Sequence, residues 1–201
     1  MVNELKAQAE ALEWGAPDRY QAGASDEQIA LAAKVDPRHF GLLYERYADR
    51  LYRYAISRTG SAAVADDIVS ETAVSALESL ERFDPEKGSF SAWIFTIASR
   101  RIADHSRVHQ RLWRYITRQG PEEIPTNPPL DGIVRDERRV RVRKAIERLP
   151  DNQRETVLLR YVAELPIAAI AETLSISEGA VKMRLQRGLR NLAAELGEPD
   201  E

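Results

Sequence analysis

The sequence contains no cysteine and three histidines among its 201 residues. Disulfide bonds, thiolate metal sites and cysteine nucleophiles are therefore excluded, and little material remains for a zinc site. No run of about 18 apolar residues occurs, and the first residues, MVNELKAQAEALEWG, are acidic without a continuous apolar stretch. We therefore expect neither a membrane span nor a secretory signal, and a cytoplasmic location.

Strand patterns are also nearly absent, because no segment sustains a two-residue alternation of apolar side chains. Apolar residues instead recur at helical spacing, as in Leu43, Tyr47, Leu51 and Tyr54. The fold class predicted is all-α. In the helix expected near residues 64–80, the inner face includes Ile68, Val69, Thr72, Ala76 and Leu77, and the acidic side chains point outward.

Proline and glycine are concentrated in QGPEEIPTNPPLDG, residues 119–132, which holds four prolines and two glycines. Such a segment cannot sustain a helix and is typical of an interdomain linker. The predicted organisation is an acidic N-terminal tail at 1–24, a helical lobe at 25–118, the Pro-rich linker at 119–132 and a second helical lobe at 133–201.

The formal net charge of -3 conceals an uneven distribution of charge along the chain. Residues 1–37 carry 3 basic and 7 acidic side chains, whereas residues 100–148 carry 13 basic and 7 acidic ones, a local net charge of +6. A concentrated positive segment in an acidic chain fits a polyanion-binding face. A solvated, salt-bridged helix face would show the same pattern, so charge alone leaves both interpretations open.

The most specific pattern is LPIAAIAETLSISEGAVKMRLQRGLRNL, residues 165–192. Two apolar helical faces flank a short turn at 175–177, and Ser177 is well placed to cap the second helix. The inward positions expected in that helix are Val181, Leu185, Leu189 and Leu192, and the outer ones are Glu178, Gly179, Lys182, Met183, Arg184 and Arg187. The pattern predicts a helix-turn-helix whose basic recognition helix fits the DNA major groove, with a plain helical hairpin as the alternative.

Aromatic residues are interleaved with arginines between residues 82 and 118. The aromatic positions are Phe83, Phe90, Trp93, Trp113 and Tyr115, and the basic ones include Arg100, Arg101, Arg107, Arg111 and Arg114. Aromatic rings stack on unpaired bases and arginines follow the phosphate backbone, so this mixture suits single-stranded or melting nucleic acid. Several rings are equally explained as core residues, and for Trp93 core packing is the favoured interpretation.

No arrangement of residues indicates catalysis or a bound metal. His105 and His109, with Asp104, have the spacing of a helical metal site, but arginines surround them and no third ligand is evident. The sequence also lacks a Gly-rich phosphate loop and a nucleophile motif. We therefore expect no enzyme activity, no catalytic residue, no metal site and no cofactor.

Four segments, in order along the chain, carry a resemblance to one protein family. They are SDEQIALAAKVDPRHFGLLYERYADRLYRYA, ADDIVSETAVSAL, FDPEKGSFSAWIFTIASRRIADHSR and ERLPDNQRETVLLRYVAELPIAAIAETLSISEGAVKMRLQRGLRNL. With the linker between the last two, they resemble bacterial RNA polymerase sigma factors of the extracytoplasmic-function (ECF) group, which keep the conserved regions two and four. The resemblance implies a promoter-specificity subunit that recognises the -35 and -10 promoter elements and opens DNA.

The resemblance also implies roles for individual residues. Asp67 and Glu71 match acidic positions on the helix that docks on a coiled coil of the polymerase's largest subunit. The positions that match the -10 reading and melting surface are Phe83, Lys87, Ser89, Arg100, Arg101, Asp104 and Arg107. The positions that match the -35 recognition helix are Ser177, Glu178, Gly179, Lys182, Arg184 and Arg187, and Arg160 matches a position that contacts backbone phosphate.

The implied partners are core RNA polymerase, through its largest and second-largest subunits, promoter DNA and an anti-sigma factor. Two alternatives stay open: a stand-alone helix-turn-helix regulator that binds duplex DNA without polymerase, and a sigma-like decoy that does not initiate. The decoy rests on departures from the family pattern at Ser70, Ala73 and Arg100. For the acidic tail, residues 1–24, we hypothesise an autoinhibitory or regulator-contacting role.

Overall fold

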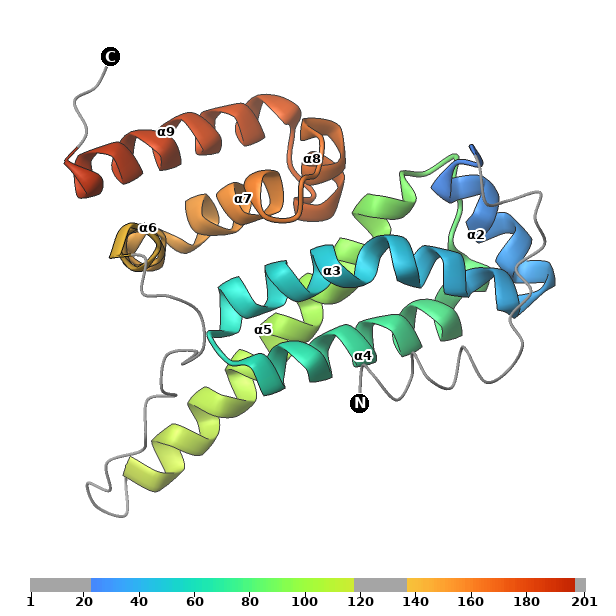
Figure 1. The fold of residues 1–201 in the computed structure, drawn as a ribbon, viewed down its shortest axis with the longest axis horizontal. Coiled ribbons are helices and arrows are strands. Elements are labelled where there is room, and N and C mark those ends of the chain that lie inside the picture. Colours follow the sequence, from blue (N-terminus) through green and yellow to red (C-terminus); the bar gives the residue numbers. More distant parts are fainter. Residues whose placement is uncertain (1–22, 118–136, 198–201) are drawn as a thin grey trace. The chain divides into compact units, whose positions relative to one another are not determined.

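The computed structural model describes residues 23–117 and 137–197, and within these ranges every regular element is a helix (Figure 1). The all-α prediction is thus confirmed for the described residues. The chain divides into two compact units, Met1–Pro128 and Pro129–Glu201, which we call the N-terminal and C-terminal lobes. The predicted linker and nearly all of the predicted tail lie outside the described residues.

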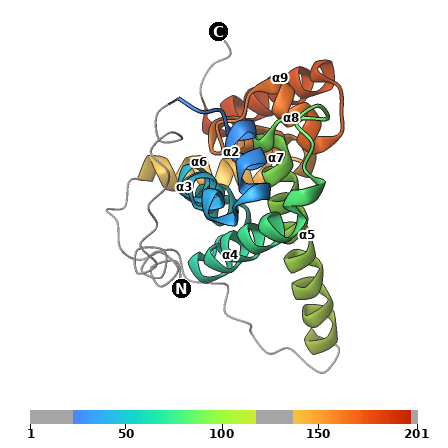
Figure 2. The ribbon, with the colours of Figure 1, turned by 90° about the vertical axis from the view of Figure 1, so that its right-hand side faces the viewer.

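The N-terminal lobe is a bundle built around three long helices. Its elements are α2 (Asp26–Val35), η2 (Pro37–His39), α3 (Phe40–Thr59), α4 (Ala62–Ser79), η3 (Leu80–Arg82) and α5 (Phe90–Thr117). Helices α3, α4 and α5 pack on one another, and α2 packs on α3, α5 and η3. Figures 1 and 2 show the C-terminal part of α5 extending past the ends of α3 and α4.

Local sequence signals determine where these helices begin and end. Ser25 and Gln28 form a capping box at the start of α2. The side chain of Asp36 caps η2, and Ser61 caps α4. Helix α3 ends at Gly60 in the left-handed conformation, with φ of 71°, which glycine adopts without steric penalty.

The core of the N-terminal lobe is rich in aromatic rings. Tyr47 is fully buried, and its ring lies 5.4 Å from that of Phe90 and 6.3 Å from that of Phe95, between centroids. Its hydroxyl donates to the carboxylate of Asp26, so α2 is tied to α3 by a part-buried polar contact. Burial, followed by this hydrogen bond, raises the pKa of Tyr47, which keeps the phenol neutral.

The C-terminal lobe contains α6 (Glu137–Arg148), α7 (Asp151–Tyr161), α8 (Ile167–Leu174) and α9 (Glu178–Leu196). Helix α9 packs on each of the other three helices. The buried apolar side chains that form the core are Ala145, Leu149, Val157, Leu158, Leu159, Ala163, Leu165, Ala169, Ile170, Ala171, Val181 and Leu185. Helices α8 and α9 with the turn between them form the predicted helix-turn-helix.

Helices α7 and α9 approach each other closely at Gly188. A Cβ atom added to Gly188 would lie 2.9 Å from Cγ2 of Val157 and 3.6 Å from Cβ of Gln153. Gly188 therefore belongs to the buried face of α9. Leu189, which the sequence predicts to point inward, is 42% exposed instead. The prediction for Leu189 is wrong because apolar periodicity considers only large apolar side chains. Here the small size of Gly188 lets α9 pack on α7 at that position.

A membrane-spanning helix must be both long and almost entirely apolar. Over residues 23–117 and 137–197, none of the helices combines the length and the apolar character needed to cross a bilayer.

Candidate nucleic-acid and protein interfaces

The turn between α8 and α9 controls how the second helix of the motif is presented. Ser175 ends α8 in the left-handed conformation, with φ of 53°, and the N–H of Ile176 donates to the carbonyl of Ala171 at 3.0 Å. The side chain of Ser177 then accepts the N–H of Ala180 at 3.2 Å, as the sequence predicts. Because both helix ends are satisfied within the turn itself, α9 starts at a fixed place in the lobe.

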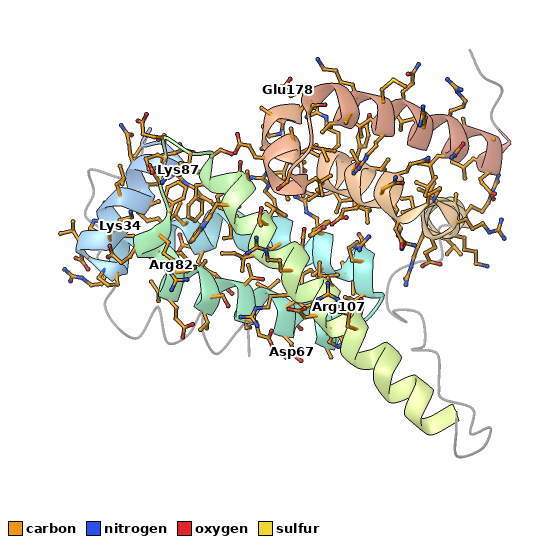
Figure 3. All side chains as sticks on the ribbon, turned by 180° about the vertical axis from the view of Figure 1, so that it is seen from behind. Lys34, Asp67, Arg82, Lys87, Arg107 and Glu178 are labelled. Carbon is orange, nitrogen blue, oxygen red and sulfur yellow. The ribbon has the colours of Figure 1, made fainter. Side chains whose placement is uncertain are left out.

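The first half of α9 presents polar and basic side chains to solvent. The exposed residues are Ser177, Glu178, Gly179, Lys182 and Arg187, whereas Arg184 is half-buried beside them. On the opposite side, Val181 and Leu185 are buried against the lobe core. All six predicted recognition residues therefore lie outside the buried face of the motif's second helix, which starts at the labelled Glu178 in Figure 3.

Arg160 lies on α7 and is exposed, as a phosphate-contacting role requires. One of its guanidinium nitrogens, Nη1, donates to the carbonyl of Leu165 at 2.9 Å, in the connection between α7 and α8. Arginine has five N–H donors in a fixed plane, so this contact orients the group and leaves further donors for an anion.

The resemblance implies that residues 83–91 capture a flipped base. We call the part of this segment that lies between η3 and α5, residues 83–89, the 83–89 loop. Its middle is a closed turn: Asp84 accepts the N–H of Lys87 through its carbonyl at 3.0 Å and the N–H of Glu86 through its carboxylate at 3.1 Å. Nζ of Lys87 lies 2.9 Å from Oδ2 of Asp84. This hydrogen bond lowers the pKa of Asp84 and raises that of Lys87, and Lys87 remains exposed at the loop surface.

Phe83 is predicted to contact DNA, but its ring is 3% exposed. It packs edge-on against Phe90, with centroids 5.5 Å apart, and tilted against Trp93 at 5.4 Å. A ring enclosed in this way has no free face for a base, which corrects the prediction: Phe83 anchors the loop in the core. Trp93 is half-buried in the same cluster, and the side chain of Ser89 accepts the N–H of Ala92 at 3.3 Å in the first turn of α5.

Four predicted residues lie along α5. Arg100, Asp104 and Arg107 are exposed, and Nη1 of Arg107 lies 2.9 Å from Oδ1 of Asp104. Arg101 is half-buried, donates to Oγ of Ser75 and lies 3.7 Å from Oε2 of Glu71, both on α4. Arg101 therefore joins α5 to α4, whereas Arg100 and Arg107 project from the helix and can contact a polyanion.

The outer face of α4 combines charge with apolar surface. Asp67 and Glu71 are exposed, and Figure 3 shows Asp67 on the same side of the lobe as Arg107. One and two turns further along α4, Val74 is 55% exposed and Leu77 is 43% exposed. Leu77 was expected on the inner face together with Ala76, and that prediction is wrong for Leu77, whereas Ala76 is buried as expected. Exposed apolar groups next to carboxylates are typical of a protein-docking face. Sequence periodicity did not reveal that Val74 and Leu77 are exposed on this face.

Asp104, His105 and His109 have the spacing of a helical metal site, but the sequence argues against one. Among the residues whose side chains are described, no group of three or more histidine, aspartate or glutamate side chains is placed to hold a metal ion. The side chain of His109 lies outside the described residues.

The fold and these surfaces define a class: a helical protein with a helix-turn-helix that exposes basic side chains in one lobe, and with exposed acidic and apolar side chains on α4 in the other. Residues 43–112 match the model of Sigma-70 region 2, and residues 139–192 match the model of Sigma-70 region 4. The chain belongs to the ECF RNA polymerase sigma factors. Members of this family are promoter-specificity subunits of bacterial RNA polymerase.

Individual relatives agree with the family models. The ECF RNA polymerase sigma factor SigL of Mycobacterium tuberculosis is 30% identical over 171 residues, which cover 85% of this chain and 96% of SigL. The ECF RNA polymerase sigma factor BldN of Streptomyces coelicolor is 32% identical over 186 residues, 92% of this chain. The matched region spans 65% of the length of BldN.

Solved structures share the fold. CnrH, determined in complex with the cytosolic domain of CnrY, superposes with a TM-score of 0.62 and 25% identity, over 84% of this chain and 94% of CnrH. The sigma factor RpoE of Bartonella quintana, determined with the anti-sigma factor NepR, superposes with a TM-score of 0.57 and 23% identity, over 73% of this chain and 89% of RpoE. The second comparison supports the fold alone.

Proposed function

We propose that this chain docks on core RNA polymerase through α4, reads a -35 element in duplex DNA through α9, and opens the -10 element with the 83–89 loop and α5. The observation that carries the proposal is the presence of two different surfaces in one chain. A basic helix-turn-helix face lies in one lobe, and an acidic and apolar face on α4 lies in the other. A protein that bound duplex DNA alone would need the first surface and not the second.

The proposed mechanism uses binding energy and no covalent chemistry. Lys182, Arg187 and Arg160 would hold the duplex through base edges and phosphates. Arg100 and Arg107 would follow the backbone of the displaced strand while an unstacked base enters the 83–89 loop. Opening then follows because contacts to the unpaired strand offset the lost base pairing and stacking. We accordingly propose that the chain is not itself an enzyme.

We further propose a cytoplasmic site of action and control by an anti-sigma factor. Promoter DNA and RNA polymerase are cytoplasmic in bacteria, which supports the first proposal. The structure of CnrH with the cytosolic domain of CnrY supports the second, since CnrH shares this fold and binds another protein in that structure. The alternatives are the stand-alone regulator and the decoy.

Selection of DNA from a random duplex library tests the proposal and separates it from the stand-alone regulator. We expect the complex of this chain with core polymerase to select two motifs at a constant spacing, since one rigid assembly contacts both elements. The chain without polymerase should select far fewer sequences, with one motif at most. Equal selection of a single motif with and without polymerase would favour the stand-alone regulator.

Reversal of one charge on α4 tests the docking face. We expect Asp67→Lys to weaken binding to core polymerase by about tenfold. The substitution removes a favourable charge pair with the polymerase and places a positive charge opposite the positive group that Asp67 would meet there. Fluorescence anisotropy of labelled chain titrated with core polymerase measures the effect. Glu45→Lys is the matched control, because Glu45 is also exposed and lies on α3. A loss of similar size in both variants would contradict the assignment of α4.

Removal of one arginine on α5 tests the opening surface. We expect Arg107→Ala to reduce permanganate reactivity of thymines in the -10 region several-fold, with little change in duplex binding, because its guanidinium would meet the displaced strand. Arg38→Ala is the matched control, since Arg38 is likewise exposed and paired with a near neighbour, Asp36, at 2.7 Å. A footprint as strong as that of the unsubstituted chain would contradict this role of Arg107.

A further inference from the structure

Helix α2 contacts the start of the 83–89 loop through Lys34. Nζ of Lys34 donates to the carbonyl of Phe83 at 2.6 Å and to the carbonyl of Glu81 at 3.2 Å. These carbonyls belong to the point where η3 ends and the loop begins. An ammonium group that bridges two carbonyls holds the backbone there more firmly than a neutral donor would, because charged hydrogen bonds are the stronger ones.

The same helix contacts the other end of the loop through Glu27. Its Oε1 accepts the backbone N–H of Phe90 at 3.1 Å. Phe90 is the first residue of α5, where backbone N–H groups lack partners within the helix and a negative charge is favoured by the helix dipole. Glu27 therefore completes the N-terminal end of α5 from a different helix, 63 residues earlier in the chain.

The two contacts match the geometry of α2. Glu27 and Lys34 are seven residues apart, about two helical turns or roughly 10.5 Å, so they lie on one side of the helix and reach the two ends of the loop. Figure 3 shows Lys34 at the same end of the lobe as Arg82 and Lys87. The loop ends are thus fixed to α2, while the turn closed by Asp84 carries Lys87 at the surface.

We propose that Glu27 and Lys34 are positioning residues for promoter opening: as a pair they hold the 83–89 loop in the conformation that receives an unpaired base. This inference rests on the proposed function of the loop. Helix α2 ends at Val35, before residue 43, where the match to the region 2 model begins. The two residues contact backbone atoms at the two ends of the loop.

The physical reason is preorganisation. A loop that contains Gly88 and is tied at neither end would sample several conformations, and a base would bind only after one of them had been selected. When both ends of the loop are held, the loop already has the binding conformation before DNA arrives. We therefore expect the loss of either contact to slow opening of duplex DNA, and to leave docking on polymerase and binding of the -35 duplex unchanged.

Trypsin cleavage after Lys87 reports the state of the loop without reference to polymerase or DNA. Lys34→Met removes the donor and keeps the length of the side chain, and Lys34→Arg keeps a cationic donor. Glu27→Ala removes the acceptor, and Glu27→Gln keeps it. We expect cleavage at Lys87 to be about tenfold faster in Lys34→Met and in Glu27→Ala, and near the original rate in the two conservative variants. Val35→Ala, at a position 89% exposed on the same helix, is the control.

Stopped-flow measurement of open-complex formation, on a duplex promoter and on one with a premelted -10 region, provides the functional readout. Lys34→Met and Glu27→Ala should open the duplex several-fold more slowly. Lys34→Arg and Glu27→Gln should open it at nearly the rate of the unsubstituted chain. An unchanged cleavage rate in Lys34→Met overturns the positioning role whatever polymerase does. Equal loss of opening, polymerase docking and -35 binding overturns it as well, because it indicates general unfolding.

The proposed function itself can fail separately. If the unsubstituted chain supports no opening even on the premelted template, the proposed function is wrong. If it opens DNA normally and Lys34→Met shows fast cleavage with unchanged opening on both templates, the loop is held by α2 but base capture does not depend on it, and the positioning role is rejected alone.

Discussion

Gly188→Leu is expected to destabilise the C-terminal lobe by about 3 kcal/mol. The substitution places a Cβ atom 2.9 Å from Cγ2 of Val157, a buried side chain, and adds three further carbon atoms behind it. Overpacking of a closed core commonly costs about 1 to 3 kcal/mol or more, which exceeds the gain of about 1 kcal/mol from replacing glycine within a helix. The separation of α7 and α9 should therefore increase.

Hydrogen exchange on the full chain measures this effect for each lobe separately. Amides of α7 and α9 should exchange faster in the variant, while amides of α3 in the N-terminal lobe should not change. Gly179→Ala is the matched control, because Gly179 lies in the same helix and a Cβ atom added there would have its nearest neighbour 3.8 Å away. If both variants were equally stable, the close approach at Gly188 would not be a determinant of the lobe.

Lys182→Ala is expected to weaken binding of the polymerase complex to its selected -35 duplex by about 1 to 3 kcal/mol. Lys182 is exposed in the first turns of α9, where side chains of a docked recognition helix meet base edges. If Lys182 contacts a base, the loss should be largest on the selected sequence. If it contacts phosphate, the loss should be similar on all sequences and the salt dependence of binding should fall.

Competition binding at several salt concentrations distinguishes these two modes. Arg190→Ala is the control, since Arg190 is an exposed basic residue later in the same helix and outside the predicted recognition set. An affinity of Lys182→Ala equal to that of the unsubstituted chain, on every sequence and at every salt concentration, would contradict the assignment of α9 as the recognition helix.

The features that could be predicted from sequence are local ones. The capping box at Ser25 and the cap at Ser177 use side chains within three residues of the groups that they satisfy, so the spacing in the sequence is sufficient. The left-handed end of α3 at Gly60 is equally local. Helical periodicity then gave the all-α class and the helix-turn-helix, because each element needs one apolar face to pack against its neighbours.

The features that could not be predicted depend on contacts between distant segments. Phe83 has the residue type of a base-stacking platform, and its burial follows from contact with Phe90 and Trp93 after the loop has folded back. Leu77 and Leu189 occupy positions where helical periodicity predicts burial, yet both are exposed. The residues before them, Ala76 and Gly188, are buried. The contacts of Glu27 and Lys34 join groups 47 to 63 residues apart, and no spacing rule connects them.

Run-off transcription most directly tests the central claim that this chain directs RNA polymerase to promoters. Purified bacterial core polymerase is incubated with a library of random upstream DNA, with and without the chain, and the transcripts are sequenced together with their templates. We expect transcripts that depend on the chain and start at a constant distance from two spaced motifs. Polymerase binding without any chain-dependent transcript would contradict the central claim and would identify a decoy instead.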